Sequence, residues 1–385
     1  MVLLVSMPFF FLLLCLRFIP PSSGAEGVSY LANISSSFAF SEVVLLDVQS
    51  VSHLTVDDLP LAVAGNTSIM NKMVTPRIIR QAFPSREVSE GAGSRVHRCF
   101  PGPRMRHLSP FIMLDHFMMP AAQNTGSFPD HPHRGQETIT YMLSGAIDHE
   151  DFLGNKGTIG PGDLQFMTAG RGIMHAEQPR KNDPVNDPDD TTLEGMQLWV
   201  DLPKELKYTE PRYRDVRAEE IPVATVSEGR VTVKVVAGHS HGVESLHDLT
   251  YTPIWYLDIT IKPGGRISQI VPRGWNAFIY IRKGQVVLND NNKTAGTRLV
   301  GSFHVVVFEQ EGDAVEASVP ETEDEEAGLI LFAGQPLDQE IVHYGPFVVS
   351  TQEEVYQAMT DFHRGKNGFE RALNWHSSIA GRVEH

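Results

Sequence analysis

The chain has 385 residues, of which 41% are hydrophobic and 21% charged, a globular composition with room for roughly two to three domains of about 150 residues each. Its formal net charge of −15 disfavours direct binding to nucleic acid, because affinity for phosphates depends on Lys and Arg. The 32 Gly and 25 Pro favour many short strands and turns over long helices.

The first 25 residues have the pattern of a secretory leader. An almost wholly apolar run covers Pro8 to Leu16, and Ser23-Gly24-Ala25 would serve as a small-residue cleavage site. The run is short and Arg17 follows it at once, so we expect no stable transmembrane segment. Residues 26–72 are Ser-rich and weakly patterned, and we expect a disordered extension there. A genuine leader would send the protein into the secretory pathway, whereas a start at Met73 or at Met70 would remove it.

From Arg77 to Val200 the sequence alternates short β-type runs with turn signals, which favours an all-β domain. Strands are expected at Phe111–Asp115, Thr138–Leu143, Asp163–Met167 and Met196–Val200, with Gly-rich turns at Ser144-Gly145 and Gly160–Asp163.

Two segments of this region carry metal-ligand side chains at alternate positions. His131 and His133 form one pair, and His175 and Glu177 form the other. In an extended strand, side chains i and i+2 leave the same face, so each pair points together. If the two strands face each other across a barrel, three imidazoles and one carboxylate converge. That set suits a divalent first-row metal and leaves coordination positions open.

Pro132 makes the first of these strands irregular. Proline cannot donate a ladder hydrogen bond, so the segment is expected at a sheet edge or a bulge. Glu137 competes with Glu177 for the role of carboxylate ligand, because on a regular strand it would share a face with His131 and His133. Spacing alone does not decide between the two carboxylates. They could also divide the work, one as the ligand and one as its hydrogen-bonded partner.

A second β-rich half runs from about Val231 to Val349, after a Pro- and charge-rich connector. Its expected strands are Ile254–Ile261, Ala277–Ile281 and Val305–Phe308. Setting Gly284 against Gly145 gives an offset of 139 residues, which places Ile270, Pro272 and Ala314 at the positions of His131, His133 and His175. The second half is therefore predicted to repeat the first barrel without its metal donors.

Two further segments are interpreted as structural. His239 and His241 form another i, i+2 pair, but Gly lies on both sides and no second donor pair follows, so we expect a loop. Thr351 to His363 has helical spacing at Val355, Met359 and Phe362, which predicts an amphipathic C-terminal helix that serves packing.

Several motifs together resemble the pirin family of the cupin superfamily. They are Phe128-Pro129-Asp130-His131-Pro132-His133-Arg134-Gly135, Glu137-Thr138, Asp148-His149-Glu150-Asp151-Phe152, Pro161-Gly162-Asp163-Leu164-Gln165 and Thr168-Ala169-Gly170-Arg171-Gly172-Ile173-Met174-His175-Ala176-Glu177. The resemblance covers most of Met73 to Val383. It implies a bicupin, an all-β fold of two double-stranded β-helix (jelly-roll-like) barrels in tandem. We expect a metal-binding domain at 73–205, a domain without metal at 206–350, and a helix and tail at 351–385.

The resemblance also implies a site and an activity. Iron would be bound by His131, His133, His175 and Glu177, so Fe²⁺ is the expected cofactor, although the same donors would accept Ni, Cu, Mn or Co. Some pirins are quercetin 2,3-dioxygenases. We therefore expect a monomer that cleaves a flavonol-like substrate with O₂, with Glu177 or Glu137 as the base. The alternative is a non-catalytic iron-dependent redox sensor, either a transcription cofactor or a signalling partner. The resemblance implies a location in the cytoplasm or nucleus.

Overall fold

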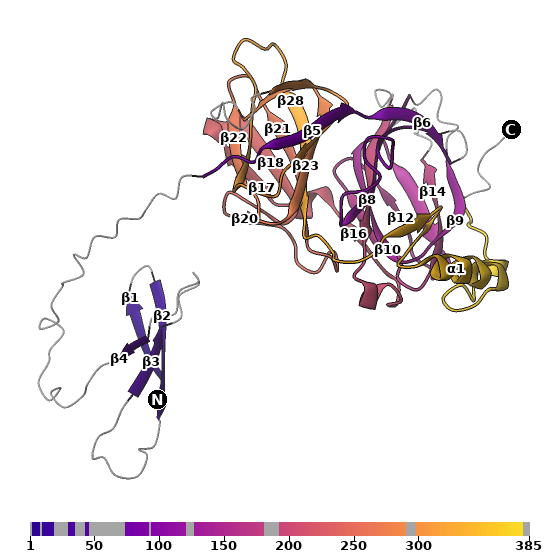
Figure 1. Cartoon of the computed structure of the whole chain (residues 1–385), viewed down its shortest axis with the longest axis horizontal. Helices are drawn as coiled ribbons and strands as arrows, with labels where there is room; N and C mark the ends of the chain where they lie inside the picture. Colours follow the sequence, from indigo (N-terminus) through magenta and orange to yellow (C-terminus); the bar gives the residue numbers. More distant parts are fainter. Residues whose placement is uncertain are drawn as a thin grey trace, which may run out of the picture. The chain divides into compact units, whose positions relative to one another are not determined.

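A computed structural model gives the fold (Figure 1). It describes residues 74–91, 94–120, 127–180, 192–289 and 298–379. Before them it gives the backbone of a four-stranded antiparallel sheet, β1 (Val2–Met7), β2 (Phe10–Phe18), β3 (Tyr30–Ile34) and β4 (Val43–Leu45). These strands belong to a compact unit, Met1–Lys72, separate from the unit Met73–His385. The predicted leader and extension lie largely outside the described residues.

The unit Met73–His385 consists of two β-rich halves, each built from one large and one small antiparallel sheet. The seven-stranded sheet of the first half has the order β16 (Arg212–Val216), β13 (Leu164–Thr168), β10 (Gln136–Ser144), β15 (Thr192–Asp201), β8 (Phe111–Pro120), β7 (Ser94–Phe100) and β6 (Arg86–Glu90). Its four-stranded sheet has the order β12 (Lys156–Ile159), β11 (Ile147–Asp151), β14 (Ile173–Pro179) and β9 (Phe128–His133).

The second half has the same arrangement. Its seven-stranded sheet has the order β17 (Val223–Val226), β18 (Val231–Ala237), β21 (Ile254–Ile261), β28 (Ala327–Gly334), β23 (Asn276–Lys283), β26 (His304–Phe308) and β5 (Ile79–Pro84). The four-stranded sheet has the order β22 (Arg266–Ile270), β27 (Ala314–Ser318), β24 (Gln285–Leu288) and β25 (Arg298–Gly301). The predicted all-β fold of two tandem cupin barrels is thus confirmed.

Short elements complete the described part of the chain. Two hairpins are formed by β19 (His239–Ser240) with β20 (Val243–Glu244) and by β29 (Val342–Tyr344) with β30 (Phe347–Val349). Single 3₁₀ turns are η3 (Lys204–Leu206), η4 (Ala218–Glu220), η5 (Ser227–Gly229) and η7 (Ala372–Asn374). The pair His239 and His241 therefore sits on a very short hairpin, close to the expected loop.

The predicted C-terminal helix is present as α1 (Gln352–Arg364). Thr351 caps it: its hydroxyl accepts from the Glu354 amide at 3.2 Å, and the Glu354 carboxylate accepts from the Thr351 amide at 3.0 Å. Gly365, at φ +59°, ends it in the left-handed conformation that glycine adopts without strain. No helix among the described residues is long and apolar enough to cross a membrane.

Two strands are exchanged between the halves. β5 precedes the whole first barrel in sequence, yet it pairs with β26 at the edge of the second large sheet (Figure 1). β16 lies in the expected connector, yet it pairs with β13 at the edge of the first large sheet. Each large sheet therefore includes one strand from the other side of the predicted domain boundary at residue 205.

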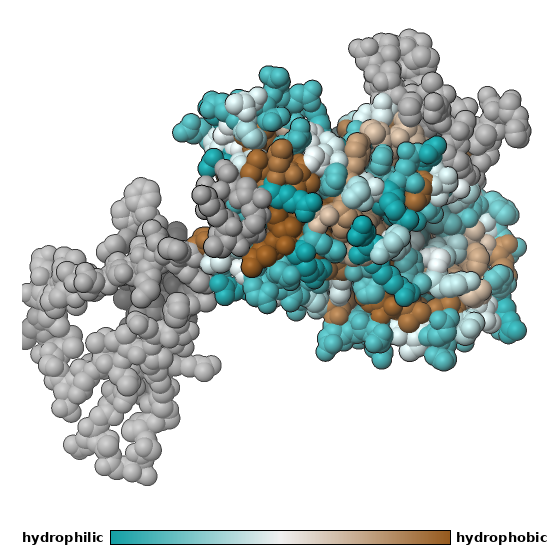
Figure 2. Space-filling view, turned by 45° about the horizontal axis from the view of Figure 1, so that its top comes forward, coloured by the Kyte–Doolittle hydropathy of each residue, from teal (hydrophilic) through white to brown (hydrophobic). Residues whose placement is uncertain are grey.

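A shared aromatic core joins the two halves. The ring of Phe111 from β8 lies 5.3 Å from that of Phe278 on β23, which in turn stacks on Phe332 of β28 at 4.7 Å. The hydroxyl of Tyr141 donates to Asp258 across the same boundary at 2.8 Å. Complete burial of each such ring stabilises the fold by about 1.5–3 kcal/mol, so the halves form one packed body. On the face shown in Figure 2, hydrophilic residues cover most of the described surface and apolar residues gather in a few patches.

The interiors of the two barrels differ. In the second barrel, Ile279 of β23 belongs to a fully buried apolar cluster that fills the interior. The residue 139 positions earlier is Thr140 of β10, and it lines a cavity of about 540 Å³ in the first barrel. The repeat predicted from the sequence is therefore present, and at this position the second barrel has an apolar core residue where the first has a polar residue beside a cavity.

Candidate metal centre

The two donor segments are adjacent strands of one sheet. β9 and β14 pair antiparallel, with His131 directly opposite His175 and Ile173 opposite His133. The condition set for their convergence, that the two strands face each other across a barrel, is not met; the donors converge because cross-strand partners share a face. β9 is an edge strand, as Pro132 predicted.

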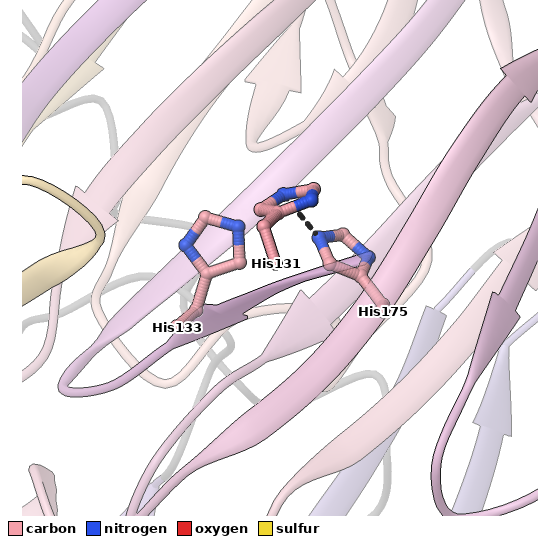
Figure 3. Close-up of side chains that lie close together, drawn as sticks. All are labelled: His131, His133 and His175. Atoms are coloured by element: carbon pink, nitrogen blue, oxygen red, sulfur yellow. Dashed lines mark hydrogen bonds between the residues drawn. The ribbon is translucent and has the colours of Figure 1, made fainter. Parts of the chain in front are cut away.

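The three imidazoles form a compact group (Figure 3). Nε2 of His131 lies 3.0 Å from Nε2 of His175, and one nitrogen of each of the three rings lies within 4.8 Å of the others. The His133 ring centroid is 4.8 Å from that of His131 and 5.0 Å from that of His175. Two nitrogens at about 2.1 Å from one metal and at right angles to each other would be about 3.0 Å apart. The observed spacing fits a shared cation.

Burial keeps two of these rings in the ligand form. It lowers the pKa of His133 and of His175 well below the usual value, and the neighbouring His131 lowers both further. A metal requires the neutral imidazole, so these rings need no deprotonation to bind one at neutral pH.

Hydrogen bonds orient the rings. Nδ1 of His131 donates to the Pro129 carbonyl at 2.7 Å, which leaves the Nε2 lone pair facing His175. Nδ1 of His133 lies 2.9 Å from the side-chain amide of Gln136. Nδ1 of His175 is buried and has no hydrogen-bond partner within the described residues. The donor set therefore fits a metal, with the usual outer support, a ring N–H donated to an acceptor, at His131. At His133 the buried, unpartnered Gln136 oxygen would accept the Nδ1–H once that amide turns over.

Glu177 lies on the wall of the same cavity as His131 and His133, outside the compact imidazole group. Its carboxylate is buried and accepts from the Thr140 hydroxyl at 3.1 Å and from the Gln197 amide at 3.3 Å. The register shifts between His175 and Glu177, where β9 has one residue more than β14 (His131 to Phe128), which marks a bulge in β9; such bulges re-aim side chains next to sites.

Glu137 is not among the residues that line this cavity. Its carboxylate accepts from the Thr168 hydroxyl at 2.7 Å and from the Tyr251 amide at 3.0 Å, and Arg212 is 3.7 Å away. The expected shared face with the histidines does not exist, because Gly135, at φ +85°, turns the chain between β9 and β10, which belong to different sheets. The geometry favours Glu177 as the carboxylate of the site, and Glu137 instead joins the two halves.

The cavity beside the imidazoles is mostly apolar, with a few polar groups. Trp199 of β15 stands edge-on to the His133 ring at 4.9 Å between centroids. Three residues of the β29–β30 hairpin, His343, Gly345 and Pro346, also line it. Sequence reasoning missed Thr140 and Gln197, for which the only signal was a polar residue inside an otherwise apolar strand.

Comparison with known proteins identifies relatives. The family model described as Pirin matches residues 93–200, and the Pirin C-terminal cupin domain matches residues 256–368. Human Pirin is 43% identical over 77% of this chain and 95% of its own length. A quercetin 2,3-dioxygenase from Acinetobacter baumannii superposes with a TM-score of 0.66 at 31% identity, over 76% of this chain and 99% of its own. Bacterial pirin YhhW from Escherichia coli, in complex with nickel(II), has a TM-score of 0.50 at 18% identity, over 67% of this chain and all of its own, and shows the shared fold alone.

Proposed function

The chain belongs to the pirin family, and from that premise we propose that it is a metal-dependent dioxygenase that cleaves flavonols, of the quercetin 2,3-dioxygenase type. The observation that carries the proposal is the convergence of His131, His133 and His175 beside a barrel cavity that His131, His133 and Glu177 line. The structural likeness to a bacterial quercetin 2,3-dioxygenase supports the same reaction class.

His131, His133, His175 and Glu177 are the residues that would hold the metal. Three imidazoles and a carboxylate suit Fe²⁺, which we propose as the cofactor, and they also accept other divalent first-row metals. The nickel(II) in bacterial pirin YhhW illustrates that breadth within the fold. When bound, the metal would act as a Lewis acid toward the chelating oxygens of a flavonol.

The chain's own residues would bind, orient and deprotonate the substrate. A cavity of about 540 Å³ lies within the range of about 300–1,000 Å³ usual for small-molecule sites. Glu177 would take the proton of the flavonol 3-hydroxyl at a carboxylate oxygen, while Thr140 and Gln197 hold that carboxylate in place. The ring of Trp199 would cover one side of the substrate and exclude water.

One contact favours the alternative function, a redox sensor read by a protein partner. The Gln136 side-chain amide touches Nδ1 of His133 at 2.9 Å and also donates to the Pro346 carbonyl at 3.0 Å. Pro346 lies two residues after Tyr344, which is 55% exposed on the β29–β30 hairpin. A change of charge at the metal would therefore reach a surface hairpin through one side chain.

Oxygen uptake by the anaerobically purified full chain, with and without quercetin, tests the proposal. We expect quercetin-dependent O₂ consumption that is lost in His133→Ala and retained in His241→Ala, a matched His from the second half. If the metal-loaded protein shows no quercetin-dependent O₂ uptake, the dioxygenase proposal is overturned and the sensor function remains. A sensor further requires partner affinity that differs between the reduced and oxidised protein.

A further inference from the structure

A polar row crosses the floor of the cavity, from the metal end outward. Thr140, Gln197, Asp115 and Arg98 are successive cross-strand partners on β10, β15, β8 and β7. Cross-strand partners project from the same face of a sheet, and all four residues line the cavity. The row starts at Glu177, which Thr140 and Gln197 both contact.

Apolar side chains flank this row on both sides. Met113 and Phe117 lie two positions before and after Asp115, so they share its face, and both line the cavity. Trp199 lies two positions after Gln197 on β15, so it shares the face of Gln197, and it also lines the cavity. A polar strip between apolar walls suits a flat aromatic ligand that carries oxygen substituents at both ends.

The outer end of the row is a fixed ion cluster. Arg98 donates to both carboxylate oxygens of Asp115, at 2.9 Å and 2.6 Å, and to Oε2 of Glu90 at 2.6 Å. The Asp115 side chain is 5% exposed, whereas that of Glu90 is 41% exposed and lines the cavity. Within the described part of the chain, Nη1 of Arg98 and Oε1 of Glu90 form no hydrogen bond. Among the described residues, the cluster therefore keeps one guanidinium donor group and one carboxylate acceptor that no hydrogen bond uses.

The charge of the cluster limits what it can bind. Two carboxylates surround one guanidinium, so a carboxylate or phosphate on the ligand would meet a net negative charge. A pair of neighbouring hydroxyl groups fits better, because each hydroxyl both donates and accepts. Two strand spacings of about 4.8 Å separate Asp115 from Thr140, about 10 Å in all, which is the scale of an aromatic molecule of two to three rings.

We propose that Glu90 and Arg98 form a second subsite, which binds vicinal hydroxyl groups on the far ring of the aromatic substrate. The subsite rests on the proposed function, because it assumes that the near end of the substrate lies at the histidines. Asp115 acts through Arg98, whose guanidinium it holds in place, and is a positioning residue. Within the flavonols, the subsite would therefore favour those whose far ring carries vicinal hydroxyls over those that lack them.

The test compares the dissociation constants of quercetin, which has the vicinal hydroxyls, and galangin, which lacks them but keeps the chelating oxygens. Binding is measured without oxygen on the full-length metal-loaded protein. A hydrogen bond to a charged group is worth about 1.5–3 kcal/mol, so the wild type should bind quercetin at least about tenfold more tightly. In Glu90→Ala that ratio should fall toward one, with galangin affinity unchanged. Glu87→Ala, on the same strand but paired with Arg95 at the surface, should keep the ratio.

Each outcome separates this subsite from the reaction itself. Equal affinities in the wild type, or a ratio that survives Glu90→Ala, would overturn the subsite even if flavonols are cleaved. A ratio that depends on Glu90 in a protein without turnover would uphold the subsite and remove the dioxygenase. Failure of both flavonols to bind would overturn both proposals.

Discussion

His131 and His175 lie directly opposite each other on neighbouring antiparallel strands, with their Nε2 atoms 3.0 Å apart. In the second half the equivalent residues, Ile270 and Ala314, form the same cross-strand pair. The two halves therefore offer the same backbone frame for a site. At this pair of positions only the first half has nitrogen donors, and there polar residues such as Thr140 line a cavity.

Mutation should distinguish the roles of the two candidate carboxylates, Glu177 and Glu137. Glu177→Gln removes the proposed base, so we expect turnover to fall by about 10²–10⁴-fold with little change in stability. Glu137→Gln weakens hydrogen bonds that join the halves, so we expect a loss of about 1.5–3 kcal/mol in the free energy of unfolding, with turnover per folded molecule retained. Steady-state kinetics and urea denaturation of both variants check this, and the reverse assignment of effects would contradict it.

Gln136 should tune the affinity for metal. A metal on Nε2 of His133 leaves a proton on Nδ1, which the Gln136 side-chain oxygen accepts once the amide beside it turns over, and partners of this kind are typically worth about 10–100-fold in metal affinity. We expect Gln136→Met to weaken binding by that factor while full occupancy is still reached at high metal concentration. Competition with a chelator of known affinity measures the change. Unaltered affinity would show that His133 needs no support from this side chain.

The C-terminal helix should depend on one buried ion pair. Arg134, next to His133, donates to Asp361 of α1 at 2.9 Å, and the two side chains are 1% and 4% exposed. Asp361→Ala leaves the guanidinium buried and unpaired, so we expect the free energy of unfolding to fall by about 3–5 kcal/mol. Glu87→Ala breaks an exposed pair with Arg95 and should cost no more than about 1 kcal/mol. Similar losses in chemical denaturation of the two variants would argue against a special role for the buried pair.

Metal removal should lower thermal stability. A metal that binds only the folded state at about 100 times its dissociation constant adds about 2.7 kcal/mol, so a chelator should reduce Tm measurably. The double variant His131→Ala/His133→Ala should have the same Tm with and without the chelator. Calorimetry on both proteins tests this, and a chelator effect of equal size in the variant would place the metal elsewhere.

Patterns over a few residues of the sequence predict the features that depend on neighbouring residues alone. Proline at position 132 predicts an edge strand, alternate positions predict which donors share a face, and Thr351 with Glu354 closes the predicted helix. The internal repeat even predicts which residues replace the histidines. Each of these depends on backbone rules within a few residues, or on the similarity of two segments.

The remaining features of the fold and the site depend on pairing between strands that are far apart in the sequence. Nothing near β9 indicates that β14 is its hydrogen-bonded neighbour, or that the turn at Gly135 moves Glu137 into another sheet. The exchange of β5 and β16 and the row from Thr140 to Arg98 bring together residues far apart in the chain. Such contacts become visible only once the strands are placed.

Metal content per chain is the most direct test of the central claim, that His131, His133 and His175 hold one metal ion in the first barrel. The full-length protein, purified without oxygen and analysed by mass spectrometry of its metals, should contain one ion per chain. The triple variant His131→Ala/His133→Ala/His175→Ala should contain none, and His239→Ala/His241→Ala should retain the ion. An undiminished metal content in the triple variant would contradict the account.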